Sequence, residues 1–134
     1  MSRRDILIFK NLENLTLNRD TGINKLERAV KKYKHGMQEE ANRIVTELRR
    51  SRKALIKVMK DLKDTDIGDD IKEYVETLVE FNDLVAVPRE RDLIKQLIEA
   101  SERNGSPKDV KKLKRDIEEL DKLRSLIKEV LQKF

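Results

Sequence analysis

Between residues 28 and 60, the positions that follow one another at steps of three and four carry mainly positive side chains. This spacing places them on one face of an α-helix, and the only carboxylate among them is that of Glu39. Like charges one helical turn apart repel by about 0.2–0.5 kcal/mol per pair unless an anion compensates them. The pattern favours a polyanion-binding face over a merely solvated one, on which both signs usually mix. The candidate binding residues are Arg28, Lys31, Lys32, Arg49, Arg50, Lys53, Lys57 and Lys60.

If the polyanion is a nucleic acid, these side chains would contact phosphates, which gives affinity without reading sequence. The same face holds one Asn, one Thr and no aromatic platform on which bases could stack. The residue types therefore predict binding to the backbone of double-stranded DNA rather than recognition of bases or single strands.

Residues suited to catalysis are scarce. His35 is the only histidine and cysteine is absent, which argues against a zinc site, a histidine-based catalytic pair and a thiolate nucleophile. Five acids cluster between Asp64 and Glu73, but helix starts favour acids through capping and the helix dipole, so we do not expect a metal there. We expect no enzyme activity and no cofactor.

Composition sets the scale of the molecule. The 134 residues suffice for one domain, and 37% hydrophobic content with 4% aromatic residues permits only a thin, aliphatic core. Residues 1–61 hold 16 Lys and Arg against 8 Asp and Glu, whereas residues 62–134 hold 15 against 18, so the amino-terminal half attracts anions. Many charged residues and no cysteine are typical of thermophiles. No apolar run is long enough to span a membrane, so we expect a soluble protein.

The apolar pattern predicts an all-α protein. Residues 1–20 are interpreted as an apolar arm, and a turn signal at residues 18–22 precedes one very long amphipathic helix over 21–63, in which Gly36 permits a bend. Residues 64–134 are predicted to contain three further helices, with Pro88 starting the second and residues 104–107 forming a tight turn before the last. The long helix has more apolar length than the shorter ones cover, so we expect other subunits to complete the core.

An apolar arm, a long basic helix and a compact helical remainder in a small basic chain resemble the major coat proteins of filamentous archaeal viruses. The resemblance lies in the layout of most of the chain and includes no diagnostic motif. It implies α-helical subunits that wrap double-stranded DNA and self-associate into a helical filament, in some cases together with a second related coat protein. It also implies that the protein is part of the virion and, before assembly, lies in the host cytoplasm. It also implies subunit contacts through the arm and the last helix. The corresponding interface residues are Ile6, Ile8, Phe9, Leu12, Leu120, Ile127 and Phe134.

Two alternatives stay open. The basic face can belong to a coiled-coil module that binds an acidic protein or faces only water. The turn at residues 104–107 can instead belong to a helix-turn-helix regulator, in which the last helix enters a major groove. The residues that would enter the groove are Lys108, Lys111, Lys112, Lys114 and Arg115.

Overall fold

The protein is an all-helical bundle. A computed structural model describes residues 2–33 and 38–134, and no strand occurs in these ranges, which confirms the predicted all-α class. The α-helices are α1 (Arg3–Tyr33), α2 (Gln38–Asp64), α3 (Asp69–Phe81), α4 (Val87–Arg103) and α5 (Pro107–Leu131), and a π-helical segment (Asn82–Ala86) joins α3 to α4 without a break.

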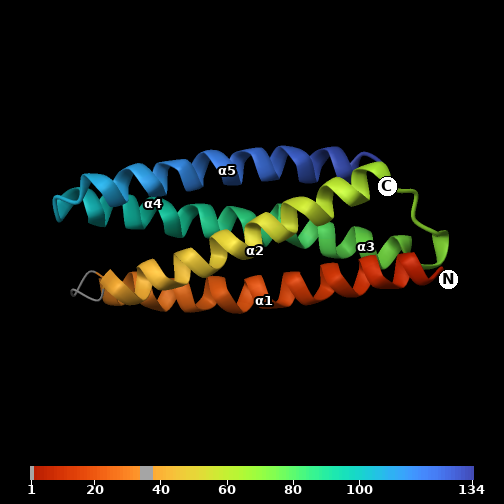
Figure 1. Cartoon of the computed structure of the whole chain (residues 1–134), viewed down its shortest axis with the longest axis horizontal. Helices are drawn as coiled ribbons and strands as arrows, with labels where there is room; N and C mark the ends of the chain where they lie inside the picture. The colour runs from red at the N-terminus through yellow and green to blue at the C-terminus, as the bar shows by residue number, and fades with distance from the viewer. Residues whose placement is uncertain (1, 34–37) are drawn as a thin grey trace.

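The helices form two antiparallel hairpins that lie side by side (Figure 1). The first hairpin is α1 with α2, and the second is the continuous α3–α4 rod with α5. Between the hairpins, α1 runs parallel to α3 and α4, and α2 runs parallel to α5 (Figure 1). In the described part of the chain, α2 does not approach the backbone of α3 or α4, so these helices occupy a diagonal of the bundle.

The interpretation of residues 1–20 as an arm is wrong, because helix α1 begins at Arg3 and continues through the predicted turn at residues 18–22. Thr21 lies inside the helix and its hydroxyl donates to the carbonyl of Leu17 at 3.1 Å. Gly22 permits close packing of α2, since a Cβ there would lie 3.0 Å from Cδ2 of Leu48. The turn signal therefore marks a close contact between helices rather than a chain reversal.

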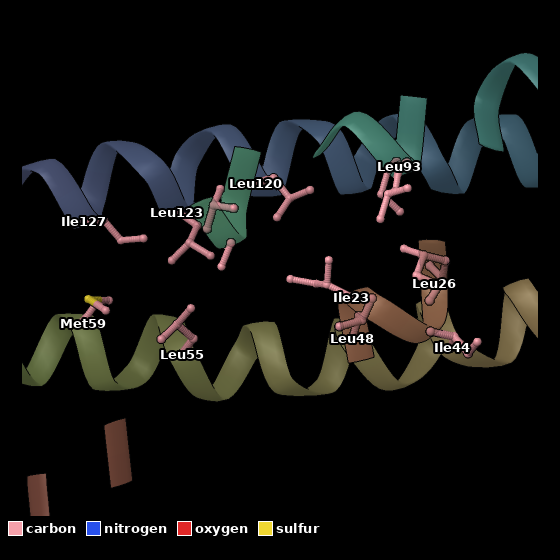
Figure 2. Packing of buried hydrophobic residues seen from close by; sticks show 14 of the residues in the cluster. Ile23, Leu26, Ile44, Leu48, Leu55, Met59, Leu93, Leu120, Leu123 and Ile127 are labelled. Atoms are coloured by element: carbon pink, nitrogen blue, oxygen red, sulfur yellow. The ribbon is translucent and has the colours of Figure 1, made fainter. Parts of the chain in front are cut away.

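The single helix over residues 21–63 is also wrong, because α1 ends at Tyr33 and α2, which begins at Gln38, packs back along it (Figure 1). The predicted bend at Gly36, like His35, lies outside the described residues. The two parts of the predicted apolar stripe face each other and the second hairpin (Figure 2). The chain therefore covers its own apolar surface, and other subunits are not required to complete this core.

Pro88 does not start a separate helix. It lies in the first turn of α4, directly after the π-helical segment and inside one continuous rod. A proline ring clashes with the carbonyl four residues earlier and offers no N–H to it. The wider π turn over residues 82–86 accommodates this defect without ending the helix. By contrast, the predicted turn at residues 104–107 is confirmed, with Gly105 at φ 68° and Pro107 at the first position of α5.

The connection between the hairpins is held by side chains from both ends of the chain. The Asp5 carboxylate accepts a hydrogen bond from the backbone N–H of Gly68 at 3.0 Å, next to the start of α3. The Lys133 ammonium donates to the carbonyls of Leu62, Lys63 and Thr65 at 2.8–2.9 Å, at the end of α2. Each side chain satisfies backbone groups that a helix end leaves unpaired.

Four charged side chains, one from each rod, meet in the interior of the bundle. Arg19, Arg52, Glu90 and Asp116 are at most 3% exposed. Arg52 donates to Asp116 at 2.8 Å and to Glu90 at 2.7 Å. Arg19 also pairs with Glu90 and donates to the Leu48 carbonyl at 3.1 Å. The first hairpin thus supplies both arginines and the second supplies both carboxylates.

In this network burial and the neighbouring carboxylates act in opposite directions on the pKa values of the two arginines. Burial is the largest influence on the pKa of Arg52 and lowers it, but Glu90 and Asp116 together outweigh burial, so the pKa is raised. Burial lowers the pKa of Arg19, and Glu90 only partly offsets this effect. Packing the hairpins together buries two like charges from each, and each pair of like charges is compensated only by the pair from the other hairpin.

We expect the Arg52→Met substitution to lower the free energy of unfolding by about 3 kcal/mol, because it leaves Glu90 and Asp116 short of buried positive charge. Urea unfolding followed by circular dichroism measures the change. Arg91→Met is the matched control, since Arg91 forms a more exposed pair with Asp121. Its cost should stay below about 1 kcal/mol. Equal costs for the two variants would show that the buried network contributes no special stability.

We expect the contribution of the Asp5 carboxylate to stability to depend on pH. The hydrogen bond from Gly68 is the main reason why the pKa of Asp5 is lower than its ordinary value. The ionised form therefore stabilises the fold at neutral pH, and this stabilisation is lost as the pH falls through the lower, folded-state pKa. Asp5→Asn keeps an acceptor but cannot ionise, so its deficit in Tm at pH 7 should shrink below about pH 4. A deficit that stays constant with pH would contradict this role.

Candidate nucleic-acid interface

Helix α2 presents an uninterrupted group of exposed cations to solvent. It packs against α1 on one side and α5 on the other, so its remaining face is free. Arg50, Lys53, Lys57 and Lys60 lie on that face, and we call these four residues the basic ridge. Successive members are three or four residues apart, so the ridge extends for about 15 Å along the helix.

The basic ridge is not neutralised within the described residues. The cations of α2 that form ion pairs with other helices in the described chain are instead Arg49, Arg52 and Lys63. Glu47 is exposed one turn before Arg50, and Asp61 and Asp64 are exposed one turn after Lys57 and Lys60, but none of these carboxylates forms an ion pair with the ridge in the described part of the chain. Four positive charges one turn apart repel, and an anion placed over them would relieve that repulsion.

Arg49 does not belong to this surface, although its spacing predicted it. Its guanidinium forms a bidentate pair with the buried Asp116, with Nε–Oδ1 at 2.9 Å and Nη2–Oδ2 at 2.7 Å. The same carboxylate also accepts from Arg52, so Arg49 is the outer end of the buried network. Because the Arg49 guanidinium already donates to both oxygens of Asp116, it is not available to donate in the same way to a phosphate.

The remaining predicted cations lie elsewhere. Arg28, Lys31 and Lys32 are exposed on the last two turns of α1, at the far end of the hairpin from Lys60. Lys32 lies 3.9 Å from the Glu40 carboxylate, a weak surface pair. The predicted single strip is therefore divided, because the chain reverses between α1 and α2. Sequence spacing also missed Arg43, which is exposed on α2 one helical turn before Glu47.

A shallow groove of about 420 Å³ between α2 and α5 borders the ridge. Its floor includes Ile56, Leu123 and Leu126, and Lys60 and Lys122 stand at its rim. Glu119 and Glu129 also line it and weaken its attraction for an anion. The geometry therefore suits a charged polymer lying over the ridge better than a small anion held in the groove.

The residues predicted to join subunits lie mostly inside the chain. Leu12, Leu120 and Ile127 are completely buried, which is incompatible with an interface role in this fold. Ile8, Phe9 and Phe134 are partly buried against the same core, and Ile6 is also partly buried. The Phe9 ring contacts Tyr74 edge-on, and the Lys72 ammonium lies over the Phe134 ring. Among the described side chains, the large apolar ones that are exposed are instead Leu7, Leu17, Tyr74, Leu84 and Val85.

Sequence reasoning also missed the buried network. Arg19 follows Leu12 by seven residues, and Arg52 lies between Leu48 and Leu55, so both arginines fall on apolar faces of their helices. A lone arginine at such a position signals a buried partner. Periodicity does not reveal which carboxylates supply it.

Two other site types find little support in the geometry. Helices α4 and α5 pack antiparallel along their length (Figure 1), unlike the steeply crossed helices of a helix-turn-helix. In residues 2–33 and 38–134, no group of three or more His, Asp or Glu side chains is positioned to hold a metal ion.

Comparison with known proteins does not identify a relative. No family model, no curated protein and no solved structure matches this chain. Within the described ranges, no helix combines the length and the apolar character needed to cross a membrane.

We expect Arg49→Gln and Lys53→Gln to have opposite effects. Arg49→Gln removes the bidentate pair and should cost about 1–2 kcal/mol of stability with little effect on anion binding, because Arg49 is occupied by Asp116. Lys53→Gln should leave stability within about 0.5 kcal/mol and weaken anion binding. Thermal unfolding and retention on a heparin column measure the two properties. If Arg49→Gln weakened retention more than Lys53→Gln, the assignment of Arg49 to the interior would be wrong.

Proposed function

We propose that this protein is a non-enzymatic structural nucleoprotein that binds the phosphate backbone of double-stranded DNA through the basic ridge of α2. The observation that carries the proposal is the run of four exposed cations on one helix face without a paired carboxylate in the described chain. On a helix face that contacts only water, repulsion between these like charges destabilises the helix. A bound polyanion removes that repulsion.

The dimensions of the ridge agree with backbone binding. A duplex carries one phosphate charge per about 1.7 Å of its axis, so a length of about 15 Å carries about nine phosphates, more than four side chains can neutralise. The ridge can therefore bind in many positions along a duplex. Lysine and arginine ends in solvent, without an aromatic stacking platform on the ridge, supply charge and no base recognition.

The resemblance to coat proteins of filamentous archaeal viruses extends this proposal to a virion. Many copies would then follow one duplex, alone or with a second related protein, and would occupy the host cytoplasm before assembly. Because the described chain buries its own core, copies on this proposal associate through their surfaces rather than by completing one another's interior.

A second candidate is a module that binds another protein. It is favoured by the exposed Tyr74, Leu84 and Leu17, each more than half exposed on the first and second hairpins. This candidate does not require the basic ridge, so variants of the ridge discriminate between the two functions.

We expect fluorescence anisotropy to show binding to two unrelated duplexes of equal length with similar affinity and with a steep loss between about 50 and 200 mM salt. Combined replacement of Arg50, Lys53, Lys57 and Lys60 by Gln should weaken binding and reduce the salt slope by about 0.9 for each phosphate contact removed. Glutamine preserves helix propensity, so circular dichroism should stay unchanged.

The matched control replaces Lys95, Lys108, Lys111 and Lys128 by Gln, which removes the same charge from exposed positions on α4 and α5. This control should retain most of the affinity. An equal loss in both variants would show that only net charge matters. A larger loss in the control would move the interface to α5, and no binding at low salt would eliminate the proposal.

A further inference from the structure

Helix α3 carries a charged edge of the opposite sign. Residues 64–80 contain seven Asp and Glu residues and a single Lys. Asp69, Glu73 and Glu80 are exposed at steps of four and seven on the outer face of α3, and we call these three residues the acidic edge. In the described chain none of them forms an ion pair, and the Lys72 ammonium on the same helix lies over the Phe134 ring instead.

The basic ridge and the acidic edge cannot neutralise each other within one molecule. Helices α2 and α3 occupy a diagonal of the bundle, so their outer faces point in opposite directions. Two copies brought together by their ridges, or by their edges, would oppose like charges. The favourable arrangement places the acidic edge of one copy on the basic ridge of another.

The two surfaces also match in length. The basic ridge extends for about 15 Å from Arg50 to Lys60, and the acidic edge extends for about 16 Å from Asp69 to Glu80. On the same rod, Leu84 follows Glu80 by four residues and is 67% exposed. A partner lying over this edge would therefore cover apolar surface as well as charge.

We propose that the acidic edge of α3 is a docking surface for the basic ridge of a second copy of this chain. The contact is heterologous, because it joins two different surfaces of the same molecule. Each copy keeps one free edge and one free ridge, so association continues into open chains unless the rotation between copies closes a ring. This inference goes beyond DNA binding, and it makes the two interactions compete, since both use the basic ridge.

Screening sets the conditions for association. Exposed ion pairs are individually weak, and at about 0.1 M salt charges farther apart than about 10 Å no longer interact strongly. The contact therefore forms at low ionic strength and dissociates as salt is added. A contact made mainly by apolar side chains would respond in the opposite way.

Sedimentation of the full chain without nucleic acid tests the proposal. At low salt the weight-average mass should rise above the monomer mass of 15.8 kDa with increasing protein concentration, and it should return to that mass at high salt. A monomer at every concentration and salt, or association that salt does not weaken, would overturn the proposal.

Charge reversal gives a sharper test. Glu73→Lys with Glu80→Lys gives the edge a net positive charge, and Lys53→Glu with Lys57→Glu cancels the positive charge of the ridge, so each variant alone should remain monomeric. An equimolar mixture of the two variants should associate again. Lys95→Glu with Lys111→Glu is the control of equal charge change away from both surfaces, and it should associate like the unmodified chain. Failure of the mixture to associate would contradict the assignment of these surfaces.

Duplex DNA separates this inference from the proposed function. A variant with Glu73→Gln and Glu80→Gln keeps an intact basic ridge and gains no new cation, so it should still bind DNA although it self-associates less. Added duplex should also dissociate chains of the unmodified protein. Loss of DNA binding with retained self-association would refute the proposed function alone, and the reverse result would refute only the docking surface.

Discussion

The buried network of Arg19, Arg52, Glu90 and Asp116 is the constraint on which the arrangement of the bundle depends. Every ion pair among these four residues joins one hairpin to the other. Two aliphatic hairpins could slide along each other at little cost, whereas a misplaced buried charge costs several kcal/mol. The network is not free of cost either, because Nε of both buried arginines lacks an acceptor among the described residues. We infer that it specifies register more than it adds stability.

The same constraint distributes charge over the surface. Fixing the hairpins side by side with α2 next to α5 places α2 and α3 on a diagonal. The basic ridge and the acidic edge then face away from each other, although only eight residues separate Lys60 from Asp69 in the sequence. Arg49 links the interior to the surface charge, because it donates to Asp116 of the buried network and is therefore not part of the basic ridge. Core pairing therefore decides which cations are available to a partner.

Several features follow from local sequence alone. Apolar residues at helical spacing determine that the chain is helical and which face of each segment is buried, as Leu48, Leu55 and Leu62 show on α2. The turn at residues 104–107 was predictable, because glycine and proline each favour a specific backbone geometry. The exposed cations of α2 were predictable for the same reason as its apolar stripe. These properties depend on residues within a few turns of one another.

Only the tertiary structure decided how these helices are combined. Polar residues at 18–22 and Pro88 resemble helix boundaries, yet packing against α2 and a π turn carry the helices through them. The apolar stripe of residues 23–62 fits one long rod or a hairpin equally well, because periodicity describes a face and does not name its partner. Likewise, Arg49 and Lys53 carry the same charge on neighbouring turns of α2. Arg49 forms an ion pair with Asp116, which is 67 residues away in the sequence, whereas Lys53 stays exposed at the surface.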